Sequence, residues 1–190
     1  TFDYPEEFFK ERIHSIRRPR PDDFQIKEAA EKIKKSKNPI IISGGGVFYS
    51  NAMEELSNFA TKHNIPVTQT VMGYSTMKRD HSHYAGQIGG LGGKNTNDLA
   101  KETDLAIAVG TKLADFTTGS WANFENEKFK LVSINVSRFD ANKHLAQAVV
   151  GDAKVSLIEL SKALGDWKVG DEWNEKSQRE LKIWNEHIDK

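Results

Sequence analysis

The chain has 190 residues, no cysteine, and equal numbers of basic and acidic residues, 27 of each. This length suits one α/β domain with additional segments, and the balanced charge argues against a nucleic-acid or anionic-membrane partner. The lack of cysteine excludes disulfides, thiolate metal ligands and cysteine nucleophiles. No apolar run reaches membrane-spanning length and no signal-peptide pattern is present, so we expect a cytoplasmic protein. Because the sequence starts at Thr1, we interpret it as a piece of a longer protein.

Residues 1–21 are predicted to be an interdomain linker segment. Their aromatic and aliphatic side chains suit a short amphipathic helix over 6–16. The basic run RRPRP that follows is interrupted by Pro19 and Pro21, which are typical of a linker.

Residues 22–165 are predicted to form a central α/β domain. Asp22 or Asp23 can cap its first helix, whose apolar face would comprise Ile26, Ala29, Ala30 and Ile33. Apolar runs without polar alternation are typical of strands buried on both faces of a parallel sheet, and they predict strands at 39–43, 65–70, 104–109, 129–136 and 147–150. Helices are predicted over 51–63, 96–102 and 152–164, and a loop over 71–94. Five strands alternating with helices predict a three-layer α/β/α, Rossmann-like fold.

Residues 166–190 are predicted to be a helical linker tail. Trp173, Leu181, Trp184 and Ile188 are spaced to share one helical face. The tail and the aromatic N-terminal segment carry many apolar side chains, which are unfavourable in water. We therefore predict that one or both segments pack on the domain or on another chain.

Three glycine-containing turns provide the candidate binding residues. The strand-to-helix turn at Gly44, Gly45 and Gly46 suits a phosphate cradle, although Tyr49 replaces the third glycine of a dinucleotide motif; tight turn geometry alone is the alternative. The loop 86–93 has five glycines in eight residues, including Gly89 and Gly90, and would either wrap a ligand or permit close packing. Gly110 and Thr111 end the strand at 104–109, where parallel sheets bind ligands.

No catalytic or metal-binding residue is predicted. The loop 111–121 carries Asp115, Thr117, Thr118 and Ser120, which could bind phosphate or ribose, or satisfy their own backbone. His81 and His83 suggest a metal site, but a solvated or capping role is the preferred interpretation because no third ligand stands nearby.

Four segments together resemble the central domain of thiamin-diphosphate enzymes, the group that includes acetohydroxyacid synthase and pyruvate oxidase: PIIISGGG, DLAIAVGT, SINVSRFDANKH and VVGDAKVSLIEL. The similarity spans about residues 21–165. Within this family, DYPEEFF, GGGVFYSNAMEEL and GTKLADFTTGSW resemble a branch that hydrolyses a C–C bond to open a cyclic diketone in inositol breakdown.

The resemblance implies a homo-oligomeric parent enzyme whose two outer domains bind thiamin diphosphate and Mg²⁺. This chain would be its non-catalytic central domain, inactive alone and without a cofactor, because the family's Gly-Asp-Gly signature is absent: Ala153 follows Gly151-Asp152. The alternative is an ADP- or FAD-binding module of an acetohydroxyacid synthase-like enzyme, built on the glycines above. Flavin-binding relatives often carry acids where this chain has Asn135 and Ser137.

Overall fold

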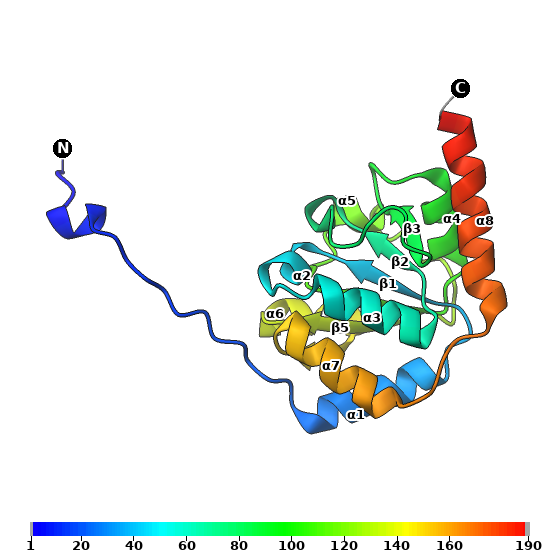
Figure 1. Cartoon of the computed structure of the whole chain (residues 1–190), viewed down its shortest axis with the longest axis horizontal. Coiled ribbons are helices and arrows are strands. Elements are labelled where there is room, and N and C mark those ends of the chain that lie inside the picture. Colours follow the sequence, from blue (N-terminus) through cyan, green and yellow to red (C-terminus); the bar gives the residue numbers. More distant parts are fainter. Residues whose placement is uncertain (1, 189–190) are drawn as a thin grey trace.

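The computed structural model describes residues 2–188 and contains one six-stranded parallel sheet (Figure 1). Its strands are β1 (Pro39–Ser43), β2 (Val67–Gln69), β3 (Tyr84–Gln87), β4 (Leu105–Val109), β5 (Lys130–Asn135) and β6 (Gln147–Val150). They lie in the order β3-β2-β1-β4-β5-β6, so the direction of winding reverses between β1 and β4. Helices cover both faces, which confirms the three-layer, Rossmann-like fold.

The two central strands explain why the sheet forms. Every residue of β1 and β4 is buried, and the strands pair in parallel with Ile41 opposite Ile107. Each strand has helices above and below it, so both faces of each strand must be apolar. The unbroken runs PIIIS and LAIAV meet that requirement.

The longer helices form two layers. In one layer, α7 (Ala153–Leu164) packs between α1 (Asp23–Lys34) and α3 (Met53–His63). In the other, α8 (Asp171–Ile188) packs against α4 (Lys94–Glu102) and β3 (Figure 1). Shorter helical turns are η1 (Glu6–Phe9), α2 (Gly45–Tyr49), η2 (Val71–Gly73), α5 (Asp115–Thr118), α6 (Arg138–Ala141) and η3 (Lys143–Leu145).

The helix ends and faces follow the sequence closely. The Asp22 carboxylate accepts hydrogen bonds from the amides of Phe24 and Gln25 and caps α1, and Asp152 caps α7 in the same way. The predicted apolar face of α1 is buried. Each cap satisfies amides that the helix leaves free, which sets where the two helices begin.

Two predicted elements were wrong, and a third began two residues later than expected. The segment 71–94 contains a sixth strand, β3, which has only four residues and little apolar character. The helix expected over 6–16 is only the turn η1, because the structure gives its apolar side chains no surface on which to pack. The helix expected over 51–63 starts at Met53, and α2 forms a separate turn before it.

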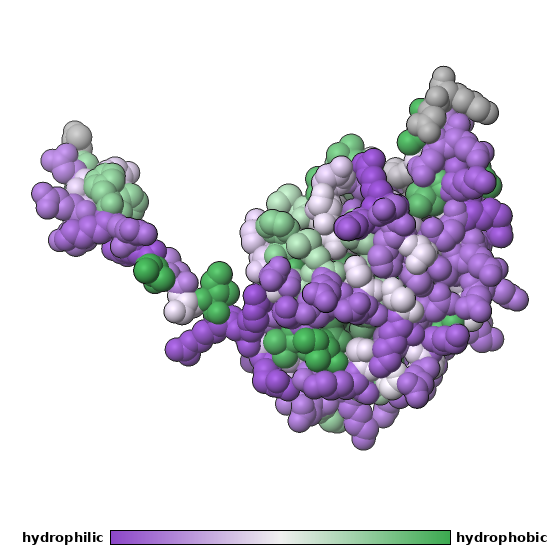
Figure 2. Space-filling view, in the orientation of Figure 1, coloured by the Kyte–Doolittle hydropathy of each residue, from purple (hydrophilic) through white to green (hydrophobic). Residues whose placement is uncertain are grey.

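The C-terminal segment folds onto the domain, as predicted for at least one end. The indole Nε1 of Trp173 donates a hydrogen bond to the carbonyl of Pro39 at 2.8 Å, and Leu181 is buried. Helix α8 also covers the outer edge of the sheet, because Gln178 donates to the Tyr84 carbonyl at 2.9 Å. By contrast, the N-terminal segment extends away from the body with Phe2 98% exposed (Figure 2).

The outer edge of β3 has further donors, one of which is the Asn95 side-chain amide, 3.2 Å from the Ala85 carbonyl oxygen. The Ala85 carbonyl accepts from the Thr96 hydroxyl of α4 at 2.9 Å, and the Gln87 carbonyl accepts from the Gly93 amide at 3.2 Å. Three carbonyls along this edge strand are therefore engaged by α8, α4 and the loop that leads into α4.

Candidate functional site

The first and third glycine turns meet at the carboxyl edge of the sheet, where β1 and β4 end. The amide of Gly44 donates to the Val109 carbonyl and the amide of Gly46 donates to the Gly110 carbonyl, both at 2.9 Å. Thr111 lies in the same contact: a Cβ atom added to Gly44 would stand 2.5 Å from the Thr111 Cβ. The structure therefore brings Gly44, Gly46, Gly110 and Thr111 together, as the shared sheet edge implied.

Close approach of the two turns explains why glycine is needed there. A Cβ on Gly46 would lie 2.6 Å from the Gly110 Cα, and one on Gly44 would lie 2.5 Å from the Gly110 carbonyl oxygen. Gly110 itself has a φ of 62°, which L residues rarely adopt. Gly45 is less confined, since its nearest atom would be the Met72 carbonyl oxygen at 3.0 Å.

Gly89 and Gly90 lie at a different place, against α5. The Gly90 amide donates to the Phe116 carbonyl at 2.8 Å, and the Gly89 amide donates to the Asn97 side chain at 2.9 Å. A Cβ on Gly89 would meet the Phe116 carbonyl oxygen at 2.4 Å. Of the two roles considered for this loop, the structure shows close packing.

A groove of about 450 Å³ lies at the point where the direction of winding reverses. In open parallel sheets this point is the usual position for a ligand. Gly46 and Gly110 line the groove, and the other five candidate residues do not. The rest of the lining comes from the ends of β5 and β6, from α2, and from residues of the N-terminal segment.

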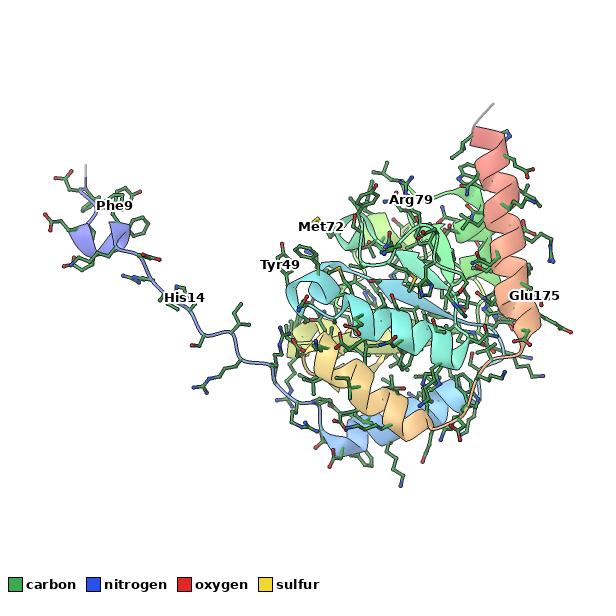
Figure 3. The ribbon with its side chains drawn as sticks, viewed as in Figure 1. Phe9, His14, Tyr49, Met72, Arg79 and Glu175 are labelled. Atoms are coloured by element: carbon green, nitrogen blue, oxygen red, sulfur yellow. The ribbon has the colours of Figure 1, made fainter. Side chains whose placement is uncertain are left out.

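The N-terminal segment crosses this groove, and the sequence analysis did not foresee it. The guanidinium of Arg18 donates to the Ser50 carbonyl and to the Asp152 carboxylate, the latter at 3.0 Å. One residue further on, the Pro19 carbonyl accepts from the Asp152 amide at 2.9 Å. Pro21 is buried. The basic, proline-containing run therefore attaches the segment to the groove before the chain extends outward (Figure 3).

Asn135 lines the groove at the end of β5, where an acid would be expected to hold a ribose. Its side-chain amide donates to the Thr111 carbonyl at 3.2 Å and its side-chain oxygen accepts from the Ser137 amide at 2.9 Å. An ionised carboxylate could not make the bond to the Thr111 carbonyl, because it has no hydrogen to donate. The asparagine thus ties the β4 and β5 loops together.

The loop 111–121 satisfies its own backbone. The Thr118 hydroxyl accepts from the Trp121 amide at 3.2 Å, and Gly119 ends α5 in the left-handed conformation. His83 is also engaged: its Nε2 lies 3.0 Å from the Asn64 Oδ1 and its Nδ1 lies 3.0 Å from the Ser82 hydroxyl. Burial and the neighbouring His81 lower the pKa of His83. Within residues 2–188 no group of three or more His, Asp or Glu could hold a metal ion.

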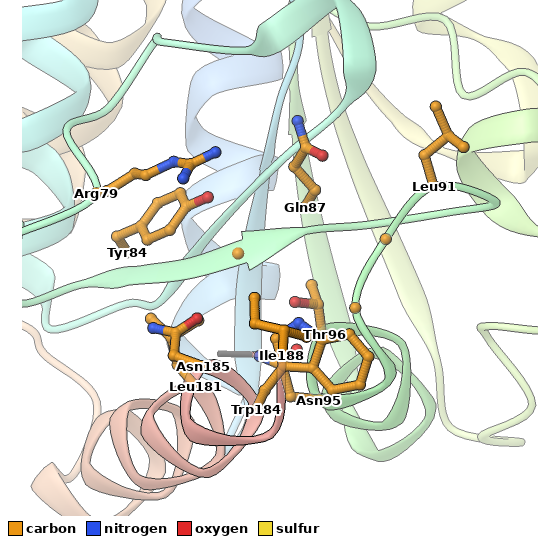
Figure 4. Close-up of a pocket in the computed structure, with 13 residues that line it drawn as sticks. Arg79, Tyr84, Gln87, Leu91, Asn95, Thr96, Leu181, Trp184, Asn185 and Ile188 are labelled. Carbon is orange, nitrogen blue, oxygen red and sulfur yellow. The ribbon is translucent and has the colours of Figure 1, made fainter. Parts of the chain in front are cut away.

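A second groove, also about 450 Å³, lies between β3 and α8 (Figure 4). Arg79 and Gln87 line it from the sheet side and Trp184 lines it from α8. Asn95 is buried beneath it, and its side-chain oxygen has no hydrogen-bond partner. None of the seven named candidate residues lies there, but Gly86, Gly92 and Gly93 of the candidate loop 86–93 line it.

The sequence profile of the thiamine pyrophosphate enzyme central domain matches residues 26–160. The chain belongs to this family, whose expected fold is the one described above. None of the helices within residues 2–188 is long and apolar enough to cross a membrane.

Three relatives of the chain are named 3D-(3,5/4)-trihydroxycyclohexane-1,2-dione hydrolase. The protein of Clostridium perfringens strain 13 is 40% identical over 188 residues, and that of Clostridium tetani is 39% identical over 189 residues. The two alignments cover 99% and 100% of this chain, respectively. A Bacillus cereus protein is 43% identical over 160 residues, or 84% of the chain. The chain spans only 25–29% of the length of these relatives.

The residues present do not fit thiamin diphosphate with Mg²⁺. Such a site needs several oxygen ligands around the ion, and the described residues offer no such cluster. The buried Asp152 carboxylate is already used by Arg18 and by the amides of α7.

Proposed function

We propose that this chain is the central, non-catalytic domain of a longer enzyme. That enzyme would use thiamin diphosphate to hydrolyse a C–C bond and open the ring of trihydroxycyclohexane-1,2-dione in myo-inositol degradation. The observation that carries the proposal is the extent of the similarity: about 40% identity to the clostridial hydrolases runs through 99–100% of the chain, including both end segments.

The finer parts of the proposal concern the whole enzyme. Residues 1–21 would be an interdomain linker, 22–165 the central domain and 166–190 a helical linker tail. Other domains would bind thiamin diphosphate and Mg²⁺, and the parent would be a homo-oligomer in the cytoplasm. The shorter span of this chain relative to the hydrolases supports additional domains.

The experiment compares this chain with the complete polypeptide of which it would be a part. Each is given the cyclic diketone with thiamin diphosphate and Mg²⁺, and ring opening is followed by product analysis. We expect turnover by the complete polypeptide and none by the chain alone. Turnover by the isolated chain would overturn the silent-domain proposal, and a complete polypeptide that leaves the diketone intact would overturn the substrate.

A second candidate is an ADP-binding module, favoured by the groove at the winding reversal, where Gly46 and Gly110 form part of the wall. Two observations oppose it: Arg18 binds Ser50 and Asp152, which are part of the groove wall, and Asn135 takes the place of a ribose-binding acid. A thermal-shift series with ADP, FAD, NAD and CoA separates the candidates, because a bound ligand raises the unfolding temperature. Stabilisation at millimolar ADP or FAD would favour the second candidate.

A further inference from the structure

The groove between β3 and α8, which we call the β3–α8 groove, holds a buried hydrogen-bond acceptor without a donor. The side-chain amide of Asn95 donates to the Ala85 carbonyl at 3.2 Å, which leaves Oδ1 as the free end of this side chain. Asn95 is only 9% exposed, and its Oδ1 has no hydrogen-bond partner within residues 2–188. Buried acceptors without a donor are rare in folded proteins. The atom therefore suits a ligand that supplies a hydrogen to donate.

Gly93 leaves space beside this acceptor. A Cβ atom added to Gly93 would lie 2.4 Å from the Asn95 Oδ1 and 2.8 Å from the Trp184 Nε1. The φ of Gly93 is −68°, which any residue adopts, so glycine is needed there for space and not for backbone conformation. An acceptor and a donor thus border one small space that a methyl group would fill. A hydroxyl group, which both donates and accepts, suits that position.

Arg79 supplies the charge of the β3–α8 groove. It is the one charged residue among the described residues that line the groove. Its guanidinium donates to the Tyr74 hydroxyl at 3.4 Å, and within residues 2–188 no carboxylate forms an ion pair with it. Guanidinium groups bind carboxylates and phosphates through paired hydrogen bonds. A single cation matches the single charge of a carboxylate better than the nearly double charge of a phosphate.

The remaining walls suit the carbon chain of a small hydroxylated molecule. Leu181, Trp184 and Ile188 line the groove from α8, whereas Arg79 and Gln87 line it from the sheet side (Figure 4). The Trp184 ring offers C–H groups a flat apolar surface. The volume of about 450 Å³ lies within the range of roughly 300–1,000 Å³ that is usual for small-molecule sites. The groove thus combines one charged group, polar groups for hydroxyls and an apolar wall.

We infer that the β3–α8 groove binds a hydroxylated carboxylate, with the carboxylate at Arg79 and a hydroxyl between Asn95 and Trp184. The proposed reaction would release such a molecule. Water that splits the bond between two adjacent carbonyl carbons adds OH to one carbon and H to the other, which leaves a carboxylic acid and an aldehyde. This source of the ligand rests on the proposed function, whereas the ligand chemistry rests on the groove. Bound product would make the groove a site for feedback on the complete enzyme.

The test uses three probes of equal chain length. Gluconate has hydroxyls and a carboxylate, glucitol lacks the carboxylate, and hexanoate lacks the hydroxyls. The chain has 4 tryptophans, whose indole N–H signals are followed by NMR in the isotope-labelled chain, and Trp184→Phe assigns the signal of Trp184. We expect gluconate to shift this signal saturably with a Kd on the order of 1 mM, as is usual for ligands of this size. Glucitol and hexanoate should bind at least about tenfold more weakly.

Two substitutions test the groove itself. Arg79→Gln removes the charge, and Gly93→Ala fills the space beside Asn95, so each should weaken gluconate binding at least about tenfold. Arg79 is exposed, so its replacement should not disturb folding. Lys78→Gln is the matched control, because Lys78 is also cationic and exposed but does not line the groove. Binding by Lys78→Gln should be unchanged.

Three results would each overturn the inference. They are a Trp184 signal that stays fixed well above the expected Kd, equal binding of gluconate and either control probe, and undiminished binding by Arg79→Gln. The source of the ligand is tested by adding the synthesised ring-opened product to the complete polypeptide equilibrated with radiolabelled gluconate. Displacement of gluconate supports the product as the ligand, and gluconate that stays bound would exclude it. The gluconate measurements need no turnover, so a failed groove and a failed hydrolase assignment give different results.

Discussion

Arg18 and Asp152 are joined by an ion pair whose nitrogen and oxygen lie 3.0 Å apart, although the residues are 134 positions apart in the sequence. The Asp152 side chain is 6% exposed and that of Arg18 is 36% exposed. The same carboxylate caps α7. The pair thus fixes the N-terminal segment to the start of a core helix.

Replacing Arg18 should therefore lower the stability of the domain itself. We expect Arg18→Ala to reduce the free energy of unfolding by about 1 kcal/mol, because Asp152 keeps its helix-capping bonds but loses its charged donor. Asp152→Ala, which removes the cap as well, should cost about 2 kcal/mol. Urea unfolding measures both values. Arg17→Ala, at the adjacent groove position, is the control, and an equal loss in Arg17→Ala and Arg18→Ala would contradict the role of the pair.

Two glycines allow backbone strain to be separated from close packing. Gly110 and Gly119 have nearly the same φ, 62° and 59°, but a Cβ on Gly110 would lie 2.6 Å from the Gly46 Cα, whereas the nearest atom to one on Gly119 would be the Asn123 side chain at 3.5 Å, an ordinary contact. Gly119 is in the left-handed helical conformation, so we expect Gly119→Ala to cost about 1–2 kcal/mol through backbone strain alone. Gly110→Ala should cost at least about 3 kcal/mol, since it adds overpacking. Similar losses for the two variants would show that the turns at Gly46 and Gly110 can separate easily.

The buried His63 predicts a loss of stability in mild acid. Its Nδ1 lies 2.6 Å from the Trp167 carbonyl and its Nε2 lies 3.0 Å from the Ser161 hydroxyl, so the partners assign a neutral ring that donates through Nδ1. Burial lowers the pKa of His63 below its usual 6.5. The folded state then binds fewer protons than the unfolded state, and stability should fall as pH drops below about 6.5.

The measurement for His63 is the free energy of unfolding in urea between pH 7.5 and 5. Burial also lowers the pKa of His83, so replacing one histidine should reduce the pH dependence without abolishing it. We expect His63→Gln to be less stable at pH 7.5 but to lose less stability on acidification than the parent chain. An unchanged pH dependence in His63→Gln would exclude His63 as a contributor.

Helix α8 should be a stable part of the fold. Trp173→Phe keeps an aromatic ring in place but leaves the Pro39 carbonyl without its donor, which should cost about 1–3 kcal/mol. Hydrogen exchange provides a local readout. We expect amides of 173–181 to be protected in the parent chain and to exchange faster in Trp173→Phe, while 10–16 exchange promptly in both. Prompt exchange throughout α8 in the parent chain would contradict the docking.

The sequence predicted the apolar strands of the sheet better than the edge strand β3. The bounds of β1 and β6 were predicted correctly, and β4 was one residue shorter than expected, because apolar runs between turn residues are unambiguous in a buried parallel sheet. β3 was missed because Tyr84–Gln87 contains a glycine and a glutamine, and its strand conformation depends on pairing with β2 and on donors from α4 and α8. Contacts with residues that are distant in the sequence leave no pattern in the sequence of the strand itself.

The sequence predicted where the candidate glycines lie, but not how closely their backbones approach each other. The glycines of the β1 and β4 turns meet as expected, yet the distances between their backbones show that each makes room for the other. A single sequence cannot distinguish that role from making room for a ligand, because both require the missing Cβ. The attachment of Arg18 was equally hidden, since its partner is remote in the sequence.

The donors along β3 have a consequence for the solubility of the chain. An exposed edge strand can recruit strands from other molecules and begin fibrillar aggregation. Here Gln178, Thr96 and the Gly93 amide occupy carbonyls that an incoming strand would use. A polypeptide truncated after Gly165 would lose α8 and open part of that edge. Helix α8 thus protects the domain against edge-to-edge association, whatever else it contacts in a complete enzyme.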